Sequence, residues 1–338
     1  MVELSNKNRL SNYELLRIFA MILIMFGHTH LRMDSMQITE PIVEVPSLYF
    51  LKNILSCITI TGVGIFIAIS GWFGIKFKIR GVVKYLYLVF FTLWVVYGIA
   101  IALHIAEFNI SGVKISMSFF DGYWFVMGYL GLYLISPILN IFIEHSTKKS
   151  FQVVLISFFL FQSYYSWLSG WYDYYDGYSI ILFSGIYLTA AYFRKYPVRF
   201  VEKNALQLWI AIILLMALIS SFTMWKFGHA GRMIRDDNPM AIWASILLLL
   251  SFKQLKFQSK IVNRMAASCF AVYLIHYSPF VYPYLMQYAN YVFSQFHGFL
   301  YAIMLLLLLI IVFIGCFLFD QVRIITWNFI NKSISNVK

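Results

Sequence analysis

The chain has 338 residues, of which 61% are hydrophobic and only 12% are charged. Soluble domains carry about a quarter charged residues, so this sequence has too little polar material to coat a soluble protein of its length. Apolar runs of about 20 residues, each long enough to cross the hydrocarbon core of a bilayer, recur from one end of the chain to the other. The composition therefore predicts an all-α, polytopic integral membrane protein with no soluble domain.

The formal net charge of +12 does not indicate a nucleic-acid partner. The basic residues form no single stripe or tail, but cluster in short loops between the apolar runs, as in membrane proteins whose loops fix orientation. The three cysteines, Cys57, Cys269 and Cys316, lie inside apolar runs. We expect them to be small buried hydrophobes and expect neither disulfides nor a metal site.

About ten transmembrane helices are expected, forming a single domain over residues 1–338. They cover residues 12–31, 54–75, 82–106, 122–143, 151–168, 179–193, 205–225, 239–252, 265–286 and 299–319. The sixth and eighth are short for a full span, so nine or eleven spans stay open. The first begins after a short polar leader and has no cleavage site of small residues behind it, so we expect it to be a permanent span.

The orientation follows from the positive charges. Most of the 26 basic residues fall in the two tails and in the loops that an even number of spans places on the same side. The positive-inside rule then puts both termini in the cytoplasm of a multi-pass protein of the cell membrane.

The first helix carries the ionisable residues Glu14, Arg17 and His28. The eleven-residue step from Arg17 to His28 is about three helical turns, so both face the same side, roughly 16 Å apart along the axis. Glu14 lies one turn before Arg17, within pairing distance. Ionisable groups inside a span are costly, which makes this polar stripe a functional candidate. The alternative is a structural ion pair and a histidine that hydrogen-bonds a neighbouring helix.

Three later segments continue an ordered pattern that starts with Glu14, Arg17 and His28. They are Gly64–Trp72 with its Ser70-Gly71 pair, Trp124-Phe125 followed by Gly131–Pro137, and Ser268–His276. Together these segments resemble the membrane-bound acyltransferase family 3, the bacterial envelope O-acyltransferases. One departure is the stretch from Arg80 to Lys84, which keeps the positive charge but lacks the family's Arg-x-x-Arg spacing and the proline after it.

The resemblance implies transfer of an acyl group, usually acetyl from cytoplasmic acetyl-CoA, to a hydroxyl of an envelope glycan or its lipid-linked precursor. The acyl-CoA would be a donor substrate and no cofactor would be permanently bound. We expect His28 to be the general base, because histidine can take and return a proton near pH 7. A covalent acyl-histidine is a variant of this mechanism. Arg17, held by Glu14, would bind a CoA phosphate or orient the thioester.

Further candidates each have a structural alternative. Arg80 and Lys84, at the expected cytoplasmic mouth, would bind the CoA phosphates or only set orientation. Ser70, beside Gly71, would line the thioester channel, or the small pair would only allow close helix contact. His276 would complete the site or hydrogen-bond between two helices.

An outer connection, residues 163–178, is rich in Tyr and Trp and contains acids but no basic residue, a composition that would suit an acceptor site for a glycan. Trp171 and Asp173, together with Trp124, are candidates for binding a sugar. The alternative is an interfacial aromatic belt. Asp236 and Asp237, in the next outer loop, are expected to be solvated charges.

A second class of function stays open. The protein could transport or flip a lipid-linked glycan, with the polar stripe of the first helix as a proton or substrate path. The dependence of its activity on acyl-CoA separates the two classes.

Overall fold

The computed structural model of the chain is helical, with no strand in the part of the chain that it describes. The described residues are 9–30, 42–44, 46–118, 121–169, 179–229 and 232–335. They pack as two compact units. One comprises the described residues within 78–126 and 261–338, and the other comprises the described residues within 2–77 and 127–260. Each unit is described by itself below, and the assignment of residues 1–338 to a single functional domain stays a prediction.

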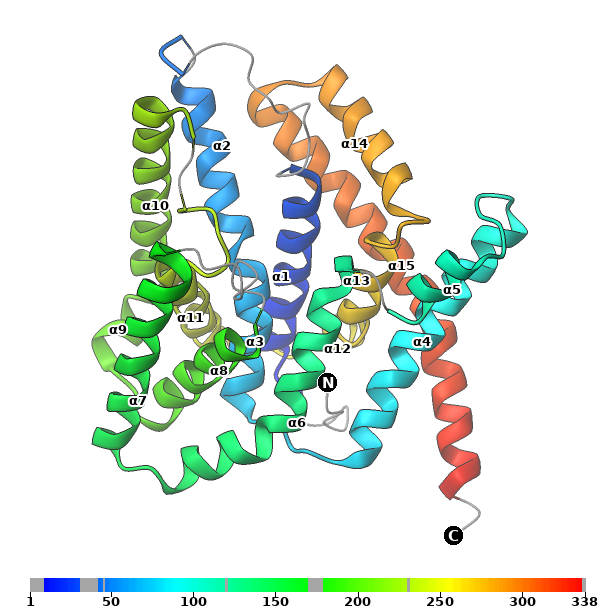
Figure 1. Ribbon diagram of the computed structural model, residues 1–338, viewed down its shortest axis with the longest axis horizontal. Coiled ribbons are helices and arrows are strands. Elements are labelled where there is room, and N and C mark those ends of the chain that lie inside the picture. The colour runs from blue at the N-terminus through cyan, green and yellow to red at the C-terminus, as the bar shows by residue number, and fades with distance from the viewer. Residues whose placement is uncertain are drawn as a thin grey trace. The chain divides into compact units, whose positions relative to one another are not determined.

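The second unit contains the N-terminal helix and most of the middle of the chain (Figure 1). Its elements are α1 (Ser11–His30), α2 (Pro46–Thr59), α3 (Thr61–Phe73), α6 (Trp124–His145, from Met127 on), α7 (Lys148–Phe161), the π-helix η3 (Gln162–Leu168), α8 (Ile180–Lys195), α9 (Arg199–Lys203), α10 (Ala205–Phe227) and α11 (Pro239–Lys253).

Helix α3 forms the centre of this unit, because it packs against α1, α8 and α11. Its glycines allow the close approach. A Cβ atom at Gly71 would lie 2.2 Å from the carbonyl oxygen of Tyr187 in α8, and one at Gly64 would lie 2.4 Å from Oγ of Ser245 in α11. Small residues at helix contacts are the usual means of bringing membrane helices together. Close helix contact, one of the two roles expected for the Ser70-Gly71 pair, is thus confirmed for Gly71.

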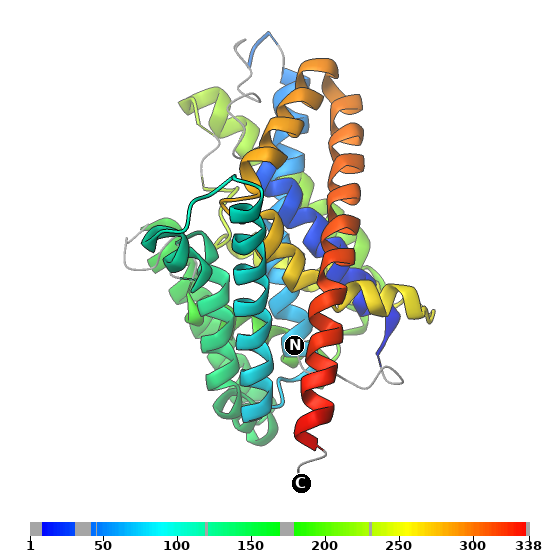
Figure 2. The same cartoon turned by 90° about the vertical axis from the view of Figure 1, so that its right-hand side faces the viewer.

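The first unit contains the long C-terminal helix. Its elements are α4 (Ile79–Ala102), α5 (Ile110–Ser116), the short 3-10 turn η2 (Asp121–Tyr123), α12 (Lys260–Ala266, from Ile261 on), α13 (Cys269–His276), α14 (Tyr282–Gln295) and α15 (Gly298–Ser335). Helices α14 and α15 form a hairpin, shown in orange and red in Figure 2, and α15 also packs against α13 and α4.

Every expected helix falls on a helical segment, but ten membrane spans are not confirmed. Six helical segments of the described chain are long and apolar enough to cross a membrane. They are Pro46–Phe73, Ile79–Ala102, Trp124–His145, Lys148–Leu168, Ala205–Phe227 and Gly298–Lys332. Helix α11 is apolar but shorter, and α1 is absent from the set because its polar and charged residues lower its mean hydropathy.

Three expected helices have the wrong extent. The helix expected over 54–75 begins at Pro46 and is divided between α2 and α3. The continuous helix over 265–286 is instead divided among α12, α13 and α14, with a break after His276. Pro279 lies in this break, and a proline inside a helix removes a backbone hydrogen bond and clashes with the preceding turn. The last helix does not end at 319 but continues to Ser335, because no proline or glycine follows residue 319 to stop it.

The three cysteines are free and buried, as expected for small hydrophobic side chains.

Candidate functional site

The first half of α1 holds a buried carboxylate between two arginines. Glu14 is 4% exposed. Its Oε1 accepts a hydrogen bond from Nη1 of Arg17 at 2.5 Å, and its Oε2 accepts one from Nη1 of Arg9 at 3.4 Å. The expected pairing of Glu14 with Arg17 is confirmed. Arg9 was missed, because its place before the first helix made it look like one more cytoplasmic tail charge.

The start of α1 is fixed by contacts with the end of α11 and the chain after it. Oγ of Ser11 accepts a hydrogen bond from the backbone N–H of Ser259 at 2.8 Å and donates one to Oε1 of Gln258 at 2.9 Å. Nδ2 of Asn12 donates to the carbonyl oxygen of Phe252 at 2.9 Å. These bonds satisfy buried polar groups of the first turn. They therefore hold the start of α1, and with it the Glu14–Arg17 pair, in place within the unit.

His28 lies in the last turn of α1 and is partly exposed. The helix is unbroken from Ser11 to His30, so the expected geometry of the stripe holds. Arg17 and His28 face the same side, about 16 Å apart along the axis. That distance is too long for the two side chains to touch, so the structure does not bring them into one contact pair. They lie at two ends of one helix face.

A second polar contact joins α3 to α6 near Arg17. Oγ of Ser70 donates to the carbonyl oxygen of Phe66 at 3.0 Å and lies 3.2 Å from the hydroxyl of Tyr129. Either hydroxyl can be the donor in the second contact. The Arg17 guanidinium is close enough to act on Tyr129 electrostatically. Tyr129 was not among the expected residues, although it lies one turn before Tyr133, which belongs to the pattern quoted above.

The end of α3 is fixed by a network of buried polar groups. The hydroxyl of Tyr187 donates to Oδ1 of Asn140 at 2.7 Å and accepts from the backbone N–H of Ile75 at 2.8 Å. Nη1 of Arg194 donates to the carbonyl oxygen of Trp72 at 2.6 Å. Because these bonds satisfy backbone groups at the helix end, they hold the last turn of α3, which follows Ser70, in place.

The expected phosphate-binding residues lie at the beginning of α4, in the first unit. Arg80 is exposed and its Nη2 donates to the side-chain oxygen of Asn331 in α15. Lys84 is one turn further along α4 and half-buried. The two therefore lie on one face of α4, since residues four apart on a helix are neighbours.

His276 and Trp124 also belong to the first unit. His276 is fully buried, and its Nδ1 lies 2.7 Å from the carbonyl oxygen of Val272 in its own helix. Trp124 begins α6 and meets Phe125 edge-on, with ring centroids 5.9 Å apart. Neither contact tests the roles expected for these residues, which stay predictions.

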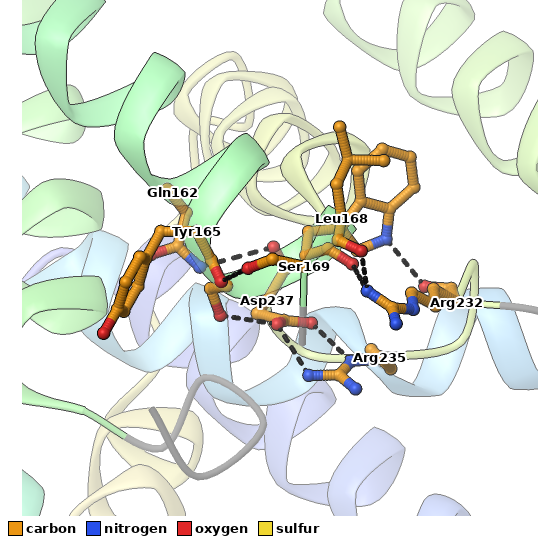
Figure 3. Close-up of polar contacts among 9 residues, drawn as sticks. Gln162, Tyr165, Leu168, Ser169, Arg232, Arg235 and Asp237 are labelled. Atoms are coloured by element: carbon orange, nitrogen blue, oxygen red, sulfur yellow. Dashed lines mark hydrogen bonds and ion pairs between the residues drawn. The ribbon is translucent and has the colours of Figure 1, made fainter. Parts of the chain in front are cut away.

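Trp171 and Asp173 lie outside the described residues, but the segment just before them is described. Residues Gln162–Leu168 form a π-helix, held by the chain between α10 and α11 (Figure 3). Asp237 is fully buried. Its Oδ2 accepts from Oγ of Ser166 at 2.6 Å, and its carboxylate also accepts from Nε and Nη2 of Arg235, both at 2.9 Å. The expectation of a solvated charge was wrong for Asp237.

Arg232 completes this cluster at the end of the π-helix. Its Nη1 donates to the carbonyl oxygens of Trp167 and Leu168, and its own carbonyl oxygen accepts from Nε1 of Trp167 at 2.9 Å. Arg232, in the connection between α10 and α11, thus holds the backbone at the end of the π-helix in place. π-Helices are rare and frequently occur at functional sites, because an extra residue per turn re-aims the side chains.

Replacing Asp237 with alanine should destabilise the protein by about 3 kcal/mol, because it leaves Arg235 and Ser166 without their buried partner. The measurement is thermal unfolding of the purified protein. The control is Ser169→Ala, which removes a hydroxyl from the same segment. Within the described residues, that hydroxyl donates to the carbonyl oxygen of Tyr165. Equal unfolding temperatures for the two variants would show that the cluster does not stabilise the fold.

A comparison with protein families identifies the family of this chain. The family model described as acyltransferase domain, of acyltransferase family 3, matches residues 10–321. The chain belongs to this family. No curated protein and no solved structure matches the chain. The match begins just before α1 and ends within α15, so it includes Glu14, Arg17 and His28, as well as His276. The long apolar helices of the chain agree with a membrane-embedded acyltransferase.

Proposed function

We propose that this acyltransferase transfers acetyl from cytoplasmic acetyl-CoA to a hydroxyl of a cell-surface polysaccharide or of its lipid-linked precursor. The polar face of α1 is the observation that supports the proposal best. It presents a guanidinium held by Glu14 at one end and His28 at the other. These groups suit the two ends of an elongated donor, whose phosphates favour arginine and whose thioester lies at the far end of a flexible arm.

The reaction needs one proton acceptor beside the acceptor hydroxyl. The hydroxyl oxygen attacks the thioester carbonyl carbon, and His28 takes the hydroxyl proton as the new C–O bond forms. The C–S bond then breaks, and the proton on His28 returns to the departing thiolate of CoA. Arg17 binds a donor phosphate or orients the thioester, while the Ser70–Tyr129 pair lies near it to position the donor.

The proposal includes an orientation. With both termini in the cytoplasm of a multi-pass cell-membrane protein, α1 runs outward, so Arg17 lies nearer the cytoplasm than His28. That order fits a donor that enters from the inside and a glycan that is reached from the outer or middle part of the membrane. The bilayer and the acyl-CoA are then the expected partners.

The test is the amount of base-labile or hydroxylamine-labile acetyl on the surface polysaccharide, compared between wild-type and deletion cells. We expect the acetyl to disappear in the deletion and to return when the gene for the full chain is restored. Unchanged acetyl in the deletion would refute the polysaccharide acceptor. Glycan translocation by the purified protein without any acyl-CoA would instead favour the competing hypothesis, a transporter or flippase of a lipid-linked glycan.

A further inference from the structure

Helix α15 carries a buried ion pair beyond the point where the sequence predicted its end. Asp320 is 1% exposed and Arg323 is 4% exposed. Nε of Arg323 donates to Oδ1 of Asp320 at 2.5 Å and its Nη2 donates to Oδ2 at 2.8 Å. The two residues lie one turn apart on the same helix, so the carboxylate holds the guanidinium in one orientation.

The same face of α15 packs against α4. Oγ1 of Thr326, one turn after Arg323, lies 2.7 Å from the hydroxyl of Tyr87, and the ring of Trp327 lies 5.0 Å from the ring of Tyr87. One further turn along, Asn331 accepts a hydrogen bond from Arg80. The interface between the two helices thus runs from Arg80 at one end to the turn that contains Arg323.

Lys84 belongs to this interface as well. Arg80, Lys84 and Tyr87 are four and three residues apart, so they lie along one face of α4. Because Arg80 and Tyr87 both contact α15, Lys84 between them faces the same way. Three cationic side chains therefore follow the α4–α15 interface, and their exposure falls from Arg80 (exposed) through Lys84 (half-buried) to Arg323 (buried). Asn331 and Arg323 are about 12 Å apart along the helix axis.

Burying an ion pair has a large desolvation cost, so stabilisation of the fold alone is a weak explanation for this pair. Replacing a buried pair by apolar side chains is often neutral or stabilising, so such a pair is weak support for a purely structural role. A guanidinium also has five N–H donors, and the two bonds to Asp320 leave three of them. Within the described residues, Asp320 is the side chain that Arg323 binds. An anion that reached this end of the interface would meet the remaining donors.

We propose that Arg323, oriented by Asp320, binds phosphate groups of the acyl-CoA donor at the inner end of the α4–α15 interface. Arg80 and Lys84 bind phosphates at its exposed end. The inference rests on the proposed function in one respect, the nature of the donor. Arginine suits this role because its planar fork binds two phosphate oxygens at once. Arg323 is a binding residue and Asp320 is the residue that positions it.

The test compares two donors on the purified full-length protein in nanodiscs. One is acetyl-CoA and the other is S-acetyl-N-acetylcysteamine, a thioester without phosphate. Arg323→Ala should raise the KM for acetyl-CoA by roughly ten- to a hundredfold, which corresponds to loss of a hydrogen bond to a charged group. Its kcat/KM for the phosphate-free thioester should stay at the wild-type value. Arg323→Lys keeps the charge but loses the planar fork. Its KM for acetyl-CoA should lie between those of the wild type and Arg323→Ala.

The matched control is Arg264→Ala. It removes the same charge from the same unit, but Arg264 is an exposed residue that bonds to Oε1 of Gln321. We expect a KM for acetyl-CoA close to that of the wild type. Asp320→Asn should raise the KM for acetyl-CoA and leave the rate with the phosphate-free thioester unchanged. Equal losses with both donors in the Arg323 and Asp320 variants would show that the pair only supports the fold, and would overturn the proposal.

A binding measurement separates this proposal from the proposed function. Adenosine 3′,5′-bisphosphate carries phosphates of CoA but no acyl group, so its binding does not depend on catalysis. Weaker binding by Arg323→Ala and Arg323→Lys than by Arg264→Ala supports the phosphate site, even if the wild type transfers no acetyl. Equal binding by all variants overturns the site, even if acetyl transfer is observed.

Discussion

Replacing His28 with alanine should abolish the proposed acetyl transfer and leave the protein in the membrane. General bases contribute about a hundred- to ten-thousandfold to the rate, and a sugar hydroxyl is a poor nucleophile without one. His28 lies at the end of α1 and is partly exposed, so its removal disturbs little packing. The measurement is labile acetyl on the surface polysaccharide, together with the amount of the protein in the membrane fraction.

His145→Ala is the matched control for this experiment, because it removes an exposed histidine at the end of α6. It should leave acetylation at the wild-type level. Acetylation that persists in His28→Ala would end the general-base mechanism. A radiolabelled acetyl group that accumulates on the wild-type protein in the absence of acceptor, but not on His28→Ala, would favour the covalent acyl-histidine variant instead.

Replacing Arg17 with alanine should also strongly reduce the proposed acetyl transfer, because it removes the group expected to bind the donor at the other end of α1. The guanidinium that would bind the donor is lost, and we expect kcat/KM for acetyl-CoA to fall by roughly a hundredfold or more. The fold should survive, because the Glu14 carboxylate keeps its second partner, Arg9, at 3.4 Å. The measurements are initial rates over a range of acetyl-CoA concentrations and thermal unfolding of the same preparations.

Two neighbouring substitutions make this prediction specific. Arg9→Ala removes the longer and weaker of the two bonds to Glu14 and should keep most of the activity. Glu14→Ala leaves two arginines beside each other without their carboxylate, and should lower the stability by about 3 kcal/mol, more than either arginine variant does. Equal loss of activity in Arg9→Ala and Arg17→Ala would mean that general positive charge, and not a positioned guanidinium, is what the site requires.

Local features of the site followed from the sequence. The charges at Glu14 and Arg17 pair as expected, because the step of three residues on a helix brings two side chains together wherever the helix packs. The shared face of Arg17 and His28 follows in the same way from helical periodicity. Membrane character followed from composition, since a chain with 12% charged residues can bury its apolar surface only in a bilayer or against itself.

The break after His276 marks the limit of this reasoning. Residues 265–286 are apolar enough to suggest one span, yet they form α12, α13 and part of α14. Hydropathy measures the solvent that a segment prefers, and does not show where its backbone bonds are interrupted. Pro279 was the available signal, because proline removes a backbone donor from the helix.

The sequence by itself determined that this protein lies in a membrane, that its first helix carries a polar face, and that its ordered motifs resemble those of the acyltransferase family to which it belongs. Only the tertiary structure decided that Ser70 meets Tyr129, that Asp237 is buried against Ser166, and that Arg323 lies on the face of α15 that packs on α4. The physical reason is that side chains facing lipid and side chains facing another helix are equally apolar. Hydropathy therefore cannot assign helix partners, and contacts between distant residues depend on the shapes and hydrogen bonds that form when helices pack.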